Sequence, residues 1–210
     1  MTNGARIVRR TRRPIYIESR IHASMDRVWE LTQNPRDHAR WDVRFSRITT
    51  VEPLEGGGTR FRYERTFPGG VITGTGTTIG ERDRPDGTRT SALRFEADSV
   101  ISPLGAGRGY WRYRPGTGAV IFSTGYDYEP AWGRVPDALL RPLIGWATAW
   151  SFDRLRIWAE SGVPPETWPL RSVLWFWRSD RPRAARCVRR AHGRAVMEQA
   201  PSTLRGLERP

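Results

Sequence analysis

The segment Pro142–Trp158, PLIGWATAWSFDRLRIW, decides how the rest of the chain is interpreted. It contains three tryptophans and carries no charge from Pro142 to Phe152. A helix that is apolar on all sides is normally buried inside a protein or a membrane. A membrane span needs about 20 apolar residues, whereas Asp153 and Arg154 end this run early. The segment therefore predicts a helix buried in its own protein.

A long helix is expected around this segment. Pro136 suits its first turn, and Gly162 suits its C-terminal cap. Because Pro142 lies inside the span, we expect a kink or a fresh start there. Trp146 and Trp150 fall on one apolar stripe of this helix, where they either fill the core or line a pocket.

The beginning of the chain predicts one strand and two short helices. Ile15–Ala23 alternates between apolar and polar residues, as a half-buried strand does. Ser24 is a suitable N-cap for the helix SMDRVWELTQ. Asn34-Pro35 ends that helix, and PRDHARWD predicts a second short helix directly after it.

The middle of the chain predicts an antiparallel sheet. Alternating segments are separated by glycine- and proline-rich turns at regular spacing, which is typical of such a sheet with one face exposed to water. The six expected strands are Phe45–Val51, Thr59–Phe67, Val71–Glu81, Arg89–Val100, Gly109–Arg114 and Ala119–Tyr128.

This order of elements, together with VWELTQNPRDHARWD and YDYEPAWG, resembles the START-like helix-grip superfamily, also called SRPBCC or polyketide cyclase-dehydrase-like. The resemblance covers about residues 13–162. It implies an α+β fold in which a curved antiparallel sheet of about seven strands wraps around the long C-terminal helix, with an apolar cavity between them. No invariant catalytic motif defines the superfamily, so the resemblance concerns the fold more than the activity.

The charge distribution suggests how the chain is divided. All 35 basic residues are arginine, and most of the net charge of +13 lies at the two ends. We expect a basic N-terminal arm over residues 1–13 and the helix-grip domain over 14–162. Residues 163–210 form a Trp/Arg-rich extension that we expect to be partly helical and disordered at its end.

The resemblance implies a hydrophobic small-molecule ligand, lipid-like or aromatic and polyketide-like. A cyclase, dehydratase or aromatase acting in the same cavity is the alternative, with Arg65 stabilising an enolate and Tyr63 or Tyr126 donating a proton. No general base pairs with these groups in the sequence, so binding is favoured over catalysis and no catalytic residue is assigned. An interaction module without any ligand is a third interpretation.

Strand alternation selects the residues expected to bind the ligand, because side chains on one face of a strand recur at every second position. Arg65 is the one charged residue on an inward face, where it either anchors an anionic group or forms a salt bridge. The expected binding residues are Trp41, Phe61, Tyr63, Arg65, Leu93, Phe95, Trp111, Tyr113, Phe122, Tyr126, Trp146 and Trp150.

No metal or cofactor is predicted. His22, His38 and His192 have no metal-ligand spacing, and Cys187 is the single cysteine. Neither a phosphate-binding loop nor a dinucleotide fingerprint occurs. GVITGTGTTIG is glycine-rich, but no helix follows it, so it predicts a curved strand.

The extension raises the question of partners. Leu170, Val173, Leu174 and Trp177 follow helical spacing and predict a short amphipathic helix, with a second, arginine-rich helix beginning near Pro182. Residues 165–194 are expected to dock on their own domain, with a protein partner or an anionic membrane surface as alternatives. Specific nucleic-acid binding is not expected, because the sheet region is nearly neutral. The sequence leaves the oligomeric state open.

The N-terminal segment RRTRRPIYIESR contains paired arginines, as export signals do. Glu18 and Arg20 interrupt any apolar segment after them. We therefore expect a cytoplasmic protein, with peripheral membrane contact left open.

Overall fold

The computed structural model describes residues 14–191 and 195–210. Its strands form one antiparallel sheet in the order β1-β7-β6-β5-β4-β3-β2, which confirms the predicted α+β helix-grip fold. The strands are β1 (Ile15–Ile21), β2 (Arg47–Pro53), β3 (Thr59–Phe67), β4 (Gly70–Glu81), β5 (Arg89–Ala97), β6 (Leu104–Gly116) and β7 (Ala119–Pro130).

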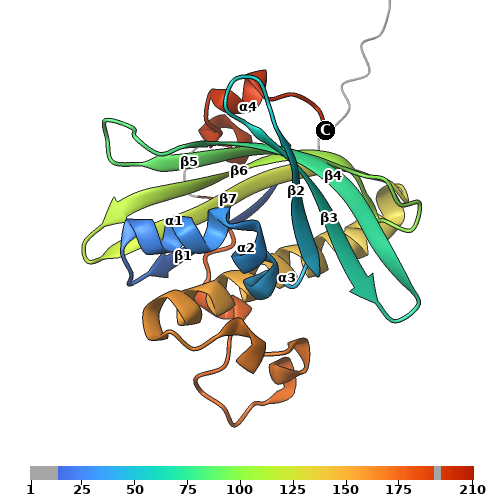
Figure 1. The fold of residues 1–210 in the computed structure, drawn as a ribbon. Coiled ribbons are helices and arrows are strands. Elements are labelled where there is room, and N and C mark those ends of the chain that lie inside the picture. Colours follow the sequence, from blue (N-terminus) through green and yellow to red (C-terminus); the bar gives the residue numbers. More distant parts are fainter. Residues whose placement is uncertain (1–13, 192–194) are drawn as a thin grey trace, which may run out of the picture.

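The helices α1 (Met25–Gln33), α2 (Pro35–Trp41) and α3 (Arg134–Ser161) lie on one side of the sheet, below it in Figure 1. Ser24 caps α1 as predicted, since its side chain accepts a hydrogen bond from the backbone N–H of Arg27 at 3.2 Å. The α3 helix ends at Gly162, whose φ of 74° is the left-handed conformation expected of a C-terminal cap. Pro142 lies inside one continuous helix, so no second helix starts there.

Aromatic side chains fill the space between α3 and the strands behind it. Phe152 of α3 stacks on Phe122 of β7 with 4.6 Å between ring centroids. Trp41, at the end of α2, meets Phe152 edge-on at 6.0 Å. All three side chains are fully buried, as is Trp150 of α3. The apolar segment of α3 is therefore the buried helix that the sequence predicts.

The prediction of an amphipathic α-helix over residues 170–177 is wrong, and so is the prediction of an arginine-rich helix after Pro182. Residues 163–191 instead form three 3-10 turns, η1 (Pro165–Thr167), η2 (Leu170–Leu174) and η3 (Ala184–Arg186). Prolines at 164, 165, 169 and 182 explain the difference, because a proline has no backbone N–H to donate along a helix.

Two neighbouring charged residues of α3 attach the extension to the domain. Asp153 is fully buried and accepts hydrogen bonds from the backbone N–H of Arg183 at 2.7 Å and from Arg186 at 2.9 Å. Arg154 is also buried and donates to the carbonyl of Pro165 at 2.7 Å. These contacts show that the extension docks on its own domain.

The end of the extension crosses to the other side of the sheet, where η4 (Val196–Gln199) and α4 (Thr203–Gly206) lie above β5 and β6 in Figure 1. Leu204 and Leu207 are buried against Ala92 of β5. The hydroxyl of Thr77 donates to the carbonyl of Glu208 at 2.6 Å. We expected disorder at this end and water on this face of the sheet, but residues 195–210 pack on the face and cover part of it.

The apolar contact of α4 predicts a measurable contribution to stability. Leu204→Ala removes buried apolar surface and is expected to lower the free energy of unfolding by about 2 kcal/mol, measured by urea denaturation. Leu174→Ala is the matched control, because Leu174 is 63% exposed and its loss should change stability by about 0.5 kcal/mol or less. Equal effects of the two substitutions would contradict the docking of α4.

Candidate functional site

A cavity of about 270 Å³ lies between the two short helices and the strands β2 to β6. Aromatic and aliphatic side chains make up much of its wall, together with hydroxyl groups and one histidine. The lining residues are Thr32, Gln33, Pro35, His38, Phe45, Ile48, Thr50, Gly57, Thr59, Phe61, Thr78, Gly80, Ser91, Leu93 and Trp111.

The α3 helix contributes no residue to this wall, so the cavity lies under α1 and α2 and not between the sheet and α3 as expected. Trp150, Phe152 and Phe122 occupy the expected position and are fully buried. Large rings in close contact leave no room there for a ligand.

Three of the predicted binding residues line the cavity, namely Phe61, Leu93 and Trp111. Most of the others are packed in the core. Trp41 is fully buried, and its indole N–H donates to the carbonyl of Leu31 at 2.9 Å. The remaining core side chains outside the lining are Phe95, Tyr113, Phe122, Tyr126, Trp146 and Trp150.

The polar groups expected to serve a cyclase lie outside this cavity. The hydroxyl of Tyr63 donates to the carbonyl of Glu96 at 3.2 Å, and burial raises the pKa of Tyr63. The hydroxyl of Tyr126 is 2.9 Å from that of Thr148, and burial raises its pKa as well. Arg65 does not line the cavity. Burial lowers the pKa of Arg154 to about 10, and the positive charge of Arg65 adds a smaller lowering.

Glycine on β4 makes room for one wall of the cavity. Gly76 pairs with Phe61 across the β3–β4 ladder, and a Cβ atom at residue 76 would lie 2.3 Å from the Cζ of that ring. Only glycine leaves space for the ring at this position. The glycine-rich segment of β4 is thus the strand that the sequence predicts, and it also allows Phe61 to lie flat on its neighbour.

His38 of α2 lines the cavity although it is not among the predicted binding residues. Its Nε2 lies 3.3 Å from Oδ2 of Asp42, and its side chain is 14% exposed. Asp42 is fully buried and also accepts hydrogen bonds from the guanidinium of Arg44, the shortest at 2.6 Å. A His–Asp–Arg chain therefore begins at the cavity wall and continues into the core.

The three groups set one another's protonation. Burial alone would raise the pKa of Asp42, but the charge of Arg44 and the hydrogen bonds from both neighbours hold it well below its usual value. Burial lowers the pKa of His38, and Arg44 adds to this effect although Asp42 opposes it. At neutral pH Asp42 is ionised and His38 is neutral.

One sequence signal was available for this pair. His38 and Asp42 stand four residues apart in PRDHARWD, the spacing that brings two side chains together on one face of a helix. Metal-ligand spacing among histidines and the cysteine does not reveal this pair, because the partner of His38 is a carboxylate.

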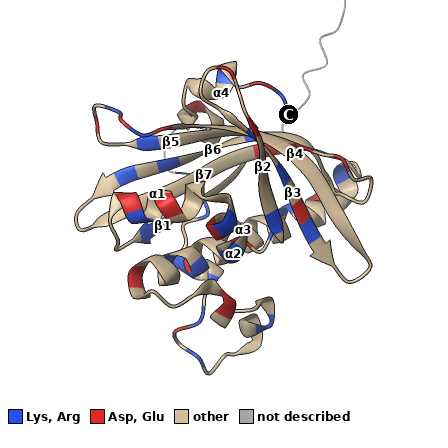
Figure 2. Ribbon diagram, in the orientation of Figure 1, with Lys and Arg blue, Asp and Glu red and all other residues tan. Residues whose placement is uncertain are grey.

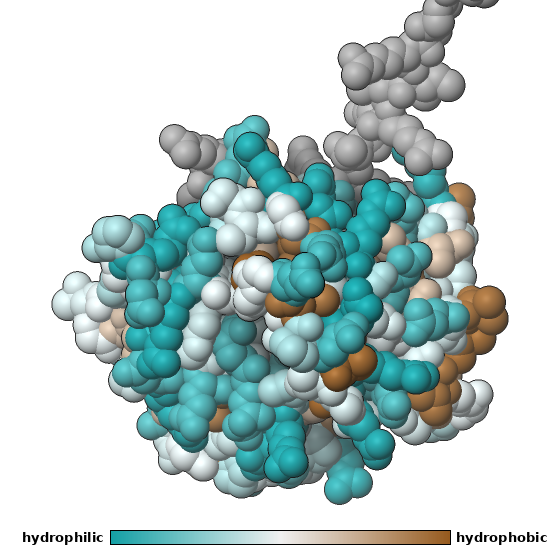
Figure 3. All heavy atoms as spheres, turned by 45° about the horizontal axis from the view of Figure 1, so that its top comes forward, coloured by the Kyte–Doolittle hydropathy of each residue, from teal (hydrophilic) through white to brown (hydrophobic). Residues whose placement is uncertain are grey.

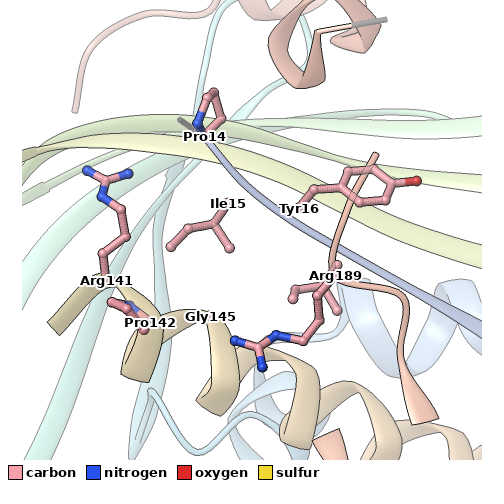
Figure 4. A pocket seen from close by; sticks show the side chains of 8 residues that line it. Pro14, Ile15, Tyr16, Arg141, Pro142, Gly145 and Arg189 are labelled. Atoms are coloured by element: carbon pink, nitrogen blue, oxygen red, sulfur yellow. The ribbon is translucent and has the colours of Figure 1, made fainter. Parts of the chain in front are cut away.

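A second depression of about 210 Å³ lies where β1 meets α3. Figure 4 shows Arg189 reaching toward Gly145 of α3, and Arg141 on the other side of Ile15. The guanidinium of Arg141 is already held by Asp137 at 3.1 Å and Asp127 at 3.3 Å. Pro14, the first residue that the structure describes, is part of its lining, and we assign this depression no role.

Charges of both signs are mixed over the strands and helices in Figure 2. Across the described part of the chain, no three His, Cys, Asp or Glu side chains gather as a metal-binding group. Within residues 14–191 and 195–210, no helix has the length and apolar character needed to cross a bilayer.

Comparison with known proteins gives relatives in sequence and in fold. A Bacillus subtilis (strain 168) protein described as "Uncharacterized membrane protein YndG" is 39% identical over 171 residues, which cover 79% of this chain and 64% of that protein. The chain therefore spans less than two thirds of the length of this relative.

Two solved structures share the fold at low sequence identity. The STAR-related lipid transfer protein of Xanthomonas axonopodis has a TM-score of 0.52 and 18% identity, covering 66% of this chain and 81% of that one. The lipid transfer and protein localization domain of human StarD13 (DLC2) has a TM-score of 0.52 and 16% identity, covering 70% and 77%.

A family model matches most of the domain. The family is described as "Polyketide cyclase / dehydrase and lipid transport", and the match covers residues 14–157. It spans the seven strands, α1, α2 and nearly all of α3, and it includes every residue that lines the cavity. The chain belongs to the polyketide cyclase / dehydrase and lipid transport family.

Proposed function

We propose that the protein binds a hydrophobic small molecule, lipid-like or aromatic, in the cavity beneath α1 and α2. The cavity is close to the lower end of the range for ligand sites, about 300–1,000 Å³. Phe45, Phe61 and Trp111 supply aromatic surface to it, and Ile48 and Leu93 supply aliphatic surface.

One observation carries the choice of binding over catalysis. His38 is the single ionisable side chain among the residues that line the cavity. A cyclase or dehydratase needs an acid and a base that act on the same substrate. Tyr63, Tyr126 and Arg65, which the cyclase alternative requires, are not part of the wall. An enzyme of that class therefore remains the less favoured proposal.

Filling the cavity is expected to abolish binding. Leu93 of β5 lines the cavity and lies opposite Gly109 of β6, so a larger ring at residue 93 takes up cavity volume. Leu93→Trp should weaken the binding of 2-naphthol, used as an aromatic probe, by about tenfold or more, because the probe loses its apolar contacts. Isothermal titration calorimetry measures this, with circular dichroism to verify the fold.

Leu139→Trp is the matched control. Leu139 is 74% exposed on α3, away from the cavity, so the same added ring should leave the affinity unchanged. Equal affinity of wild type and Leu93→Trp, or no binding of the probe to the wild type, would contradict the proposed site.

We further propose that the extension contacts an anionic membrane surface through a tip formed by residues 170–177, which comprise η2 and the three residues after it. Leu170, Leu174, Phe176 and Trp177 are between 49% and 76% exposed. The tip projects below α3 in Figure 1, away from the sheet. Exposed aromatic and aliphatic side chains beside arginines are typical of segments that insert into the interface of a bilayer.

The tip is anchored by buried tryptophan packing and belongs to an arginine-rich segment. Trp168, at its base, is 3% exposed and meets Trp175 edge-on at 6.4 Å. Residues 163–191 contain seven arginines against two carboxylates, which favours a surface of anionic lipids. The name of the Bacillus subtilis relative is consistent with this proposal. The single cysteine fits a cytoplasmic location at that surface.

Replacing the two aromatic residues of the tip should reduce membrane binding. We expect Phe176→Ser with Trp177→Ser to lower co-sedimentation with phosphatidylcholine–phosphatidylserine vesicles by about tenfold, because less apolar surface enters the bilayer. The substitutions leave the docked extension in place, which a truncation at residue 163 would not.

A second apolar surface provides the control. Val135 and Leu139, 80% and 74% exposed, lie near the start of α3, the end of the helix at the right of Figure 1. Hydrophobic atoms, brown in Figure 3, also gather on the right of that view. Val135→Ser with Leu139→Ser should leave vesicle binding unchanged. Loss of binding in this variant, with binding kept in the tip variant, would assign membrane contact to the start of α3.

A further inference from the structure

We infer that the ligand of the cavity is an aromatic molecule bearing a phenol or enol hydroxyl, and that this hydroxyl donates a hydrogen bond to Nδ1 of His38. The inference rests on the proposed binding function and narrows its ligand class. It follows from the hydrogen-bonding capacity of the wall.

Asp42 fixes the tautomer of His38. An ionised carboxylate only accepts hydrogen bonds, so the Nε2 that lies 3.3 Å from Asp42 carries the proton. The other ring nitrogen, Nδ1, then holds a lone pair. Among the described residues, none donates a hydrogen bond to this atom.

Aromatic rings surround the His38 imidazole on its remaining sides. It stacks on Trp41 with 4.9 Å between ring centroids, and the rings of Phe45 and Trp111 meet it edge-on at 5.1 Å and 4.9 Å. Its accessible part is therefore a polar acceptor framed by apolar surface. A ligand that displaces water from this acceptor loses affinity unless it brings a donor of its own.

The neighbouring polar groups are already engaged. The hydroxyl of Thr32 contacts that of Tyr113 at 2.7 Å, and the amide nitrogen of Gln33 donates to the same oxygen at 3.0 Å. The hydroxyl of Thr78 donates to the backbone carbonyl of Ala92 at 2.9 Å. The hydroxyl hydrogens of Thr32 and Thr78 and one amide hydrogen of Gln33 are thus used internally, whereas His38 offers an acceptor.

The aromatic side chains of the wall favour a planar, aromatic ligand. Phe45 and Trp111 belong both to the cavity lining and to the ring cluster around His38. Aromatic rings pack well against other flat rings. A planar ligand placed between them would carry its hydroxyl at the ring edge, within reach of His38.

The test compares 2-naphthol with 2-methylnaphthalene, in which a methyl group of similar size replaces the hydroxyl. Affinities are measured for the wild-type protein, His38→Leu and His38→Gln. We expect the ratio of the two affinities to fall about fivefold in His38→Leu, the effect of one neutral hydrogen bond. His38→Gln retains an acceptor oxygen and should restore part of the ratio.

The outcomes separate this inference from the function on which it rests. If both probes bind and their affinity ratio is the same in wild type and His38→Leu, the inference is overturned while the binding site stands. If neither probe binds the wild type, the proposed function fails and the inference fails with it.

A measurement on the wild type alone keeps the test valid if the variants do not fold. In ¹⁵N NMR spectra, the unprotonated Nδ1 of His38 should shift on addition of 2-naphthol and not on addition of 2-methylnaphthalene. His22, whose Nδ1 lies 3.2 Å from the carbonyl of Gly118 outside the cavity, is the internal reference and should not shift. Equal shifts of His38 with both probes would overturn the inference.

Discussion

The packing of the inner face of the curved sheet decides where everything else lies. A sheet of this kind leaves a hollow that must be filled to native density or remain open to a ligand. Here Phe152 of α3 stacks on Phe122 and meets Trp41, and together these rings fill the part nearest α3. The open volume is displaced toward the short helices, where His38 and Gln33 form its wall. Which residues line the cavity therefore depends on which aromatic rings fill the core.

Two buried charged side chains connect the domain to the extension. Asp153 and Arg154 end the apolar run of α3, and each binds the extension from within the domain. Arg154 also donates to the carbonyl of Trp41 at 3.2 Å. Removing one partner of such a pair leaves a costly uncompensated charge. The domain and the extension are thus joined through two buried charged side chains that form hydrogen bonds with both parts.

The sequence predicts the fold well because the fold depends on local patterns. Alternation, turn residues, the Ser24 cap and the Gly162 cap each report on neighbours a few residues away. The site is different. Strand alternation places Phe61, Leu93 and Trp111 on the inner face correctly, but it does not reveal which inner residues border empty space. That depends on ring contacts between distant elements, such as Phe122 with Phe152. The extension was misjudged for another reason, because helical spacing over residues 170–177 outweighed the prolines around it.

The extension covers one edge and part of one face of the sheet, and these contacts affect the order in which the chain folds. Val188 pairs with Glu18 on the outer edge of β1, and the Thr77–Glu208 hydrogen bond joins residues 131 positions apart. Contacts between such distant residues form slowly, because the entropy cost of closing a large loop comes before any favourable contact energy. During synthesis the N-terminal strands emerge first. The edge of β1 and this part of the outer face therefore stay uncovered until Val188 and residues 195–210, which follow the strands in the chain, pack on them.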